Sequence, residues 1–240
     1  MAVYALSDLH GCLGFYKAIK EYLKPEDKVY FLGDAGDRGP HPWETIKAIA
    51  ADPQFIYIKG NHEDMLVDAM EERLMDCSGT RPIYLLGRNG GYGTLEEWEA
   101  DGMKSKWVLW LKQLPTHMEY VRPDGKRIML SHAGYTPTVS GKLPWGDDLI
   151  WSRDHFWDPW EEELEDVYVV HGHTPTPIMD ADAYGVKKED LNKTGALVYC
   201  EGHKFNIDNG AVFTGICTLF NLDTFESIIF QGGSKEIGVE

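Results

Sequence analysis

Five apolar segments of the sequence each end in a short glycine-containing loop that carries Asp, Asn or His side chains. The loops read DLHG, GDAGDRG, GNHE, HAG and HGHTP, and they begin at Asp8, Gly33, Gly60, His132 and His171. In α/β sheets, ligands bind beyond the carboxyl ends of the strands, and parallel strands bring such loops to one edge. The pattern therefore predicts an α/β protein with a polar site at the end of its strands.

The first third of the chain alternates strand and helix patterns. We expect strands at residues 2–7, 28–32 and 55–58, and helices at 15–23, 43–51 and 63–74. This order predicts parallel strands with helices packed over them.

The remainder of the chain predicts a different arrangement. Residues 77–114 are broken by glycine and then mainly helical. We expect strands at 118–121, 127–130, 167–170, 197–200, 204–207, 212–221 and 225–230, and surface loops at 141–148 and 184–194. Turn signals between neighbouring strands indicate antiparallel hairpins, so the whole is a mixed α/β (α+β) protein. Because no linker interrupts the sequence, we expect a single domain over residues 1–240.

Charge and cysteine content exclude several classes of function. The 23 Lys and Arg residues are outnumbered by 39 Asp and Glu, a net charge of −16. This balance argues against nucleic acid or an anionic membrane as the main partner, because both require a basic face. The four cysteines form no CxxC pair and no apolar run approaches a membrane span, so we expect a cytoplasmic protein.

Each polar loop has an ordinary interpretation when it is taken alone. Asp8 and His10 would suit a solvated turn, Asn61 a helix N-cap, and His132 or His171 a hydrogen-bonded structural role. All five loops together are better explained by metal binding, and Asp, His and Asn donors without Cys suit Mn²⁺, Fe or Zn²⁺. Six candidates suffice for two ions that share a carboxylate: Asp8, His10, Asp34, Asn61, His132 and His173.

The order of these motifs resembles the calcineurin-like metallophosphoesterases, and within them the bacterial and phage type of phosphoprotein phosphatase. The residues that carry the resemblance are the five loops together with IWSR at 150–153 and IDNGAVF at 207–213. The similarity runs from about Val3 to about Leu222. It implies a four-layer fold in which two mixed β-sheets pack as a sandwich with helices outside.

The resemblance also implies a role for each site residue. It implies two divalent ions, Mn²⁺ as the first expectation and Fe or Zn²⁺ as alternatives. Asp8 and His10 would bind the first ion, Asp34 would bridge both, and Asn61, His132 and His173 would complete the second. His62, oriented by Asp37, would protonate the leaving oxygen. Arg38 and Arg153, with Asn61 and His62, would hold the phosphate.

These roles describe a metal-dependent phosphomonoesterase in which a bridging hydroxide attacks the phosphate directly. The resemblance implies a serine/threonine protein phosphatase, with dual specificity for phosphotyrosine as an extension. Lys59, where protein phosphatases usually have Arg, weakens that inference. We expect His171, where related phosphatases usually have a bulkier apolar residue, to support the site rather than bind metal.

Two alternatives remain open. The segment HAGYTP resembles the symmetrical dinucleoside tetraphosphatases, which share the fold, although Asp37 argues against them. Such a substrate, or another small phosphate compound, would need aromatic stacking partners, for which the candidates are Trp145, Trp151, Phe156, Trp157 and Trp160. The second alternative is a non-catalytic interaction module, which the complete set of ligand-type residues disfavours.

Overall fold

Two five-stranded sheets form the centre of the protein in the computed structural model, which describes residues 1–75, 89–144, 146–191 and 194–232. The first sheet has the order β10 (Ser227–Gln231), β9 (Ile216–Asn221), β1 (Val3–Leu6), β2 (Lys28–Phe31) and β3 (Phe55–Tyr57). The second has the order β4 (His117–Val121), β5 (Arg127–Ser131), β6 (Val167–His171), β8 (Lys204–Asn206) and β7 (Leu197–Tyr199).

Both sheets are mixed, with parallel strands that carry the polar loops. In the first sheet β1, β2 and β3 run parallel, and the β9–β10 hairpin pairs antiparallel with β1. In the second sheet β5, β6 and β8 run parallel, and β4 and β7 are antiparallel edge strands. The predicted combination of a parallel centre with antiparallel hairpins is confirmed.

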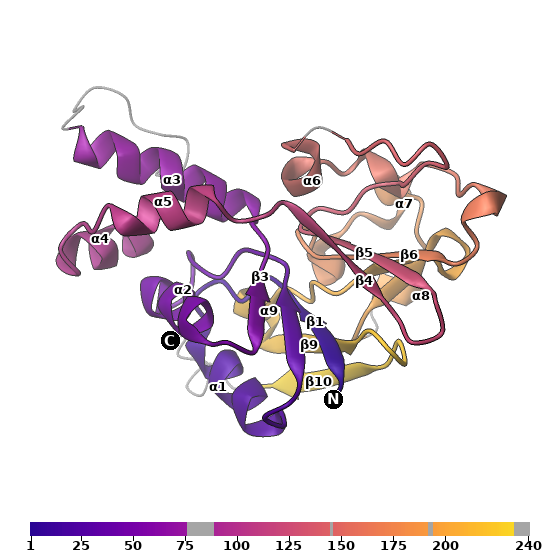
Figure 1. Ribbon diagram of the computed structural model, residues 1–240, viewed down its shortest axis with the longest axis horizontal. Helices are drawn as coiled ribbons and strands as arrows, with labels where there is room; N and C mark the ends of the chain where they lie inside the picture. The colour runs from indigo at the N-terminus through magenta and orange to yellow at the C-terminus, as the bar shows by residue number, and fades with distance from the viewer. Residues whose placement is uncertain (76–88, 145, 192–193, 233–240) are drawn as a thin grey trace.

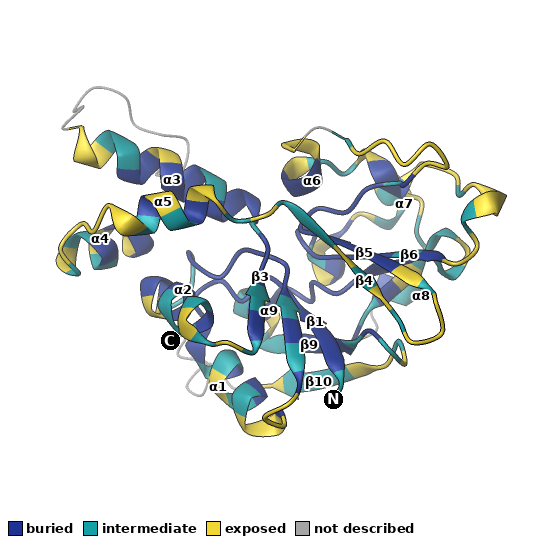
Figure 2. Ribbon diagram, in the orientation of Figure 1, coloured by how far each residue is buried: buried dark blue, intermediate teal, exposed yellow. Residues whose placement is uncertain are grey.

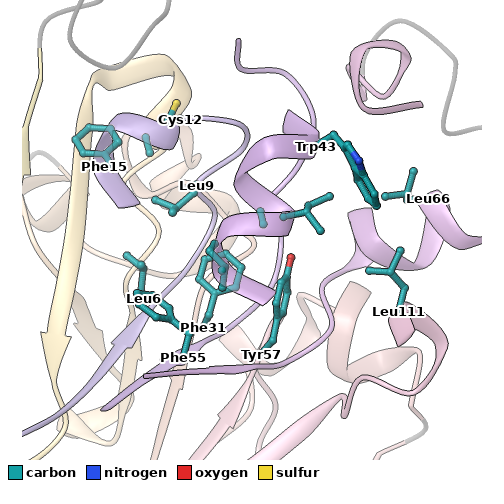
Figure 3. Packing of buried hydrophobic residues seen from close by; sticks show 14 of the residues in the cluster. Leu6, Leu9, Cys12, Phe15, Phe31, Trp43, Phe55, Tyr57, Leu66 and Leu111 are labelled. Carbon is teal, nitrogen blue, oxygen red and sulfur yellow. The ribbon is translucent and has the colours of Figure 1, made fainter. Parts of the chain in front are cut away.

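The strand β1 is buried on both faces and joins two hydrophobic cores. Tyr4 and Leu6 pack toward α1 (Leu13–Tyr22) and α2 (Pro42–Ala51), in the cluster shown in part in Figure 3. Val3 and Ala5 point the other way, into a core between the two sheets. Side chains alternate between the faces of a strand, so a strand covered on both sides is apolar throughout.

The core between the sheets fixes the position of one sheet relative to the other. Leu32 and Ile58 directly follow strands β2 and β3 of the first sheet. Leu130, Val170 and Phe205 lie in strands of the second sheet. Each fully buried side chain of this kind contributes about 2 kcal/mol. Figure 2 shows these central strands as buried and the outer loops as mostly exposed. The cores therefore hold together the strand ends that carry the site.

Helices lie outside both sheets, which confirms the predicted four-layer sandwich. The first sheet's helices continue into α3 (Asn61–Leu74), α4 (Tyr92–Ala100) and α5 (Lys106–Lys112), which project to one side in Figure 1. The second sheet is covered by loops and by the short helices α6 (Asp148–Trp151), α7 (Ala181–Tyr184) and α8 (Lys188–Leu191). Part of the expected helical segment, residues 76–88, lies outside the described residues.

Two expected elements were wrong in detail. The expected strand at 212–221 begins only at Ile216, because α9 (Ala211–Thr214) forms one helical turn between Gly210 and Gly215, both in the left-handed conformation. The expected surface loop at 184–194 contains α8, whose Leu191 packs into a small apolar cluster. Both turns are too short to leave a periodic signal in the sequence.

Candidate metal centre

The loops that follow the strands are held in a backbone conformation that side chains rarely adopt. Left-handed backbone costs a non-glycine residue roughly 1–2 kcal/mol, and such strain gathers at functional sites. Six residues of the predicted site adopt it, with these φ angles: Asp8 (54°), His10 (43°), Asp34 (61°), Asp37 (69°), Arg38 (64°) and His173 (69°). The fold therefore tolerates strain at the positions where the sequence places its polar side chains.

Asp34 lies at the centre of the site. Its Oδ2 atom is 3.4 Å from His132 Nε2, 3.7 Å from His10 Nε2 and 3.8 Å from His62 Nε2. Two buried groups of three donors, each within 4.8 Å of one another, share this carboxylate: His10, Asp34 and His62, and Asp8, Asp34 and His132. A shared carboxylate between two donor groups is the arrangement that two neighbouring metal ions require.

Asn61 and two histidines complete one side of Asp34. The Asn61 Oδ1 atom lies 2.9 Å from His132 Nε2 and 3.0 Å from His173 Nδ1, and these two nitrogens are 3.1 Å apart. The three donors thus converge on a single point. Residues that are separated by 112 positions in the sequence reach it because β3, β5 and β6 end at the same edge.

Asp8 belongs to the donor group of Asp34 and His132 and is held by residues from both sheets. One of its oxygens accepts a hydrogen bond from the backbone N–H of His173 at 3.0 Å and another from the Ser7 hydroxyl. The other oxygen is 3.9 Å from His10 Nε2. A Cβ atom on Gly172 would lie 2.1 Å from Asp8 Oδ2, so only glycine permits this contact.

Four histidine rings are anchored through one nitrogen and present the other to the site. An N–H that donates to a carbonyl oxygen leaves the opposite nitrogen with its lone pair free, which is how proteins orient metal-binding histidines. The anchors are the Gly36 carbonyl for His10 (3.0 Å), the Leu32 carbonyl for His132 (2.8 Å), the Trp151 carbonyl for His173 (3.2 Å) and the Asp37 carboxylate for His62.

The charges of the site are set by burial and by Asp34. Burial raises the pKa of Asp34, but the surrounding histidines outweigh it and hold that pKa well below its usual range. Burial likewise opposes protonation of His132, yet the Asp34 carboxylate raises its pKa to about 9. Burial and neighbouring cations lower the pKa of His10 and of His173 well below normal. The His10 and His173 rings are therefore neutral, as metal ligands must be, whereas His132 has to release a proton before it can bind a cation.

His62 forms a separate unit with Asp37. Its Nδ1 contacts the Asp37 carboxylate, which also accepts a hydrogen bond from the Thr94 hydroxyl. Burial lowers the pKa of His62, but Asp34 and Asp37 raise it above the normal value overall. Arg38 Nη2 lies 2.9 Å from His62 Nε2. The raised pKa of His62 and the neighbouring Arg38 guanidinium suit a site that receives an anion.

These groups open into one cavity of about 300 Å³. Arg38 and Arg153 line it together with Asp8, His10, Asp34, Asn61, His62 and His173, whereas His132 is fully buried. Its mouth carries apolar side chains, of which Trp151 is 41%, Phe213 59% and Ile178 68% exposed. The guanidinium of Arg38 lies 5.8 Å from the centre of the Phe213 ring. The cavity thus combines a charged floor, with two arginines and three aspartates, and an apolar rim.

The structure also places residues that sequence reasoning left open or missed. Asp208 lines the cavity and is buried, and this burial, together with the Asp8 charge, raises its pKa well above normal. The sequence feature that could have pointed to Asp208 was the IDNG segment at residues 207–210. His171 does not line the cavity, because its nitrogens contact the Tyr199 hydroxyl and the Gly172 carbonyl. Lys59 pairs with Asp64, and Trp145 lies outside the described residues.

The calcineurin-like phosphoesterase model matches residues 1–205, which is most of the chain. The matched range includes the predicted ligands and the proton donor with its partner: Asp8, His10, Asp34, Asp37, Asn61, His62, His132 and His173. The chain belongs to the calcineurin-like phosphoesterase family. This phosphoesterase is a metal-dependent hydrolase whose buried His and Asp groups fit a dinuclear centre. Within the described residues, no helix is long and apolar enough to cross a membrane.

Relatives of this chain are named either as a protein phosphatase or as dinucleoside tetraphosphatases. It is 31% identical to serine/threonine-protein phosphatase 2 of Salmonella typhimurium over 63% of this chain and 68% of that protein. It is 25% identical to the asymmetrical bis(5'-nucleosyl)-tetraphosphatase PrpE of Bacillus thuringiensis over 93% of this chain and 91% of that protein. A Saccharomyces cerevisiae serine/threonine phosphatase has the same fold, with a TM-score of 0.56 at 13% identity over 97% of this chain and 80% of that one.

Proposed function

We propose that this phosphoesterase is a phosphomonoesterase, and that phosphoserine and phosphothreonine in proteins are its first substrates. The observation that carries the proposal is a single cavity in which Asp34 joins two donor groups, with Arg38, Arg153 and His62 beside them. Two cations and two guanidinium groups around one cavity complement a phosphate dianion. The similarity to a serine/threonine-protein phosphatase supports the choice of substrate.

We assign the ligands to two ions that share Asp34. Asp8 and His10 hold the first ion, and Asn61, His132 and His173 hold the second. The donor chemistry fits this assignment, because carboxylate, amide and imidazole without thiolate suit Mn²⁺, Fe or Zn²⁺, of which we propose Mn²⁺. When bound, two such ions neutralise phosphate charge and lower the pKa of water.

The remaining residues act on the substrate. Arg38 and Arg153 bind the non-bridging phosphate oxygens through their planar guanidinium groups, with Asn61 and His62 beside them. His62 donates a proton from Nε2 to the leaving oxygen while Asp37 holds Nδ1. His62 also lies within the donor group of His10 and Asp34. We assign it to proton transfer because its other nitrogen faces a carboxylate that raises its pKa.

Hydrolysis of dinucleoside tetraphosphates is the second candidate. Trp151 and Phe213 are exposed aromatic side chains at the mouth of the same cavity, where a nucleobase could stack on them. The PrpE relatives, which match over nearly their whole length, support this candidate.

One assay distinguishes the two candidates. Purified protein with Mn²⁺ is given phosphoserine, phosphothreonine and phosphotyrosine peptides alongside dinucleoside tetraphosphates, and kcat/KM is measured for each. We expect the phosphoserine and phosphothreonine peptides to be preferred and chelation to abolish turnover. A preference for dinucleoside tetraphosphates selects the second candidate, and no turnover with any divalent metal contradicts both.

A further inference from the structure

Lys204 in β8 is a fully buried lysine that makes no ion pair in the part of the chain that the structure describes. Its ammonium group donates hydrogen bonds to the Thr136 hydroxyl at 2.6 Å and to the His155 carbonyl at 2.5 Å. It also lies 5.9 Å from the ring centres of Trp160 and Tyr199. Burial of an ammonium without a carboxylate costs free energy that hydrogen bonds to neutral acceptors only partly offset. A methionine would fill the same space without this cost.

The two acceptors of Lys204 belong to two different loops of the candidate site. Thr136 lies in the loop that follows β5 and contains His132. His155 lies in a 3-10 turn (Asp154–Phe156) that begins directly after Arg153. One ammonium group therefore connects a loop that carries a proposed metal ligand to the segment that carries a proposed phosphate-binding arginine.

The His155 ring strengthens this connection. The Tyr199 hydroxyl contacts His155 Nδ1 at 3.1 Å and His171 Nε2 at 2.7 Å. Gly134 has a φ of 82°, and a Cβ atom there would lie 2.8 Å from His171 and 2.9 Å from His155. Both rings therefore pack directly against the backbone two residues beyond His132. Lys204, His155, His171 and Tyr199 therefore form one cluster that connects the segments carrying His132, His173 and Arg153.

Arg153 depends on this support because its own side chain is weakly held. Its Nη2 donates a hydrogen bond to the His173 carbonyl at 3.5 Å, the outer limit for such a bond. We propose that Lys204 is a positioning residue, which places Arg153 for phosphate binding by tying its segment to the loop of His132. This inference rests on the proposed role of Arg153. It explains why a costly buried lysine stands where an apolar residue would fit.

The test compares Lys204→Met with wild type. We expect the KM for a phosphopeptide and the inhibition constant of inorganic phosphate to rise about tenfold, with the Mn²⁺ content unchanged. Lys126→Met is the matched control, because Lys126 also donates to a hydroxyl group and lies over an aromatic ring, but its partner in both contacts is Tyr168 within β6. It should leave both constants unchanged.

A double-mutant cycle with Arg153→Ala separates positioning from general damage. If Lys204 acts through Arg153, then Lys204→Met raises KM less than about twofold further in the Arg153→Ala background. The same tenfold rise in both backgrounds overturns the proposal. Should Lys204→Met fail to fold, Thr136→Val removes one of the two acceptors at nearly constant volume and should give a smaller rise that Arg153→Ala likewise suppresses.

Hydrogen exchange provides a readout that does not depend on turnover. In metal-free protein, Lys204→Met or Thr136→Val should speed exchange at the Phe156 and Trp157 amides, which bond back to Arg153 and Asp154. Unchanged exchange at these amides overturns the positioning role. A wild-type protein that releases no phosphate from any substrate contradicts the proposed function instead, so the two failures are distinct.

Discussion

The two halves of the site are built in different ways. The loops of the first sheet supply Asp8, His10, Asp34 and the His62–Asp37 unit, and they contain five of the six left-handed site residues. The loops of the second sheet supply His132, His173 and Arg153. A buried polar cluster around Lys204 connects these loops. The first half is distinguished by left-handed backbone within short motifs, whereas the second contains a buried lysine that links segments distant in the sequence.

Across the two halves, we expect the largest effect from replacing Asp34, the carboxylate that both donor groups share. Asp34→Asn removes the charge that both donor groups share, so we expect the metal content to fall for both ions and kcat to drop by at least about a thousandfold. Metal analysis and turnover with Mn²⁺ measure both effects.

Asp52→Asn is the control for Asp34→Asn. Asp52 is also a largely buried carboxylate, but it is paired with Lys20 far from the donor groups. The Asp52→Asn variant should retain two ions per chain. Normal metal content in Asp34→Asn would refute the bridging role of Asp34.

His62→Asn should damage turnover without damaging metal binding. We expect kcat to fall roughly 10²–10⁴-fold on phosphoserine and less on an aryl phosphate, because a good leaving group needs less protonation. His41→Asn, an exposed histidine paired with Glu44, is the control and should behave as wild type. Equal losses on both substrates would rule out proton donation by His62.

The rim should have a smaller effect that depends on the substrate. Phe213→Ala should raise the KM for substrates with an aromatic group beside the phosphate by about three- to tenfold and leave the KM for a small alkyl phosphate unchanged. Tyr92→Ala, which removes a comparably exposed ring outside the cavity, is the control. If both substrates respond alike, Phe213 does not select them.

The smallest effect concerns pH and the second half of the site. Burial and then Lys204 lower the pKa of His155 to about 3 from 6.5. A histidine with a lowered folded-state pKa stabilises the protein above pH 6.5, and that stability is lost as the pH falls from 6.5 toward 3. Replacement with Phe should therefore flatten the pH dependence of the unfolding free energy in that window, as chemical denaturation at several pH values would show. An unchanged slope would show that His155 is not buried in its neutral form.

The same contrast explains what could be predicted from the sequence. The motifs around Asp34 and His62 are contiguous, so their residues and the sheet edge were predictable, and the resemblance supplied the pairing with Asp37. Lys204 gave no such signal, because a lysine in a predicted strand usually faces water and its acceptors are far away in the sequence. That residues 1–240 form a single domain stays a prediction, as do the individual ligand roles.

The most direct test of the account is a crystal structure with Mn²⁺ and its anomalous scattering. We predict two peaks on either side of Asp34, one bound by Asp8 and His10 and the other by Asn61, His132 and His173, with His62 free to face the substrate. A single peak, or a peak bound by His62 in place of Asp8, would contradict the assignment of both ions and of the acid.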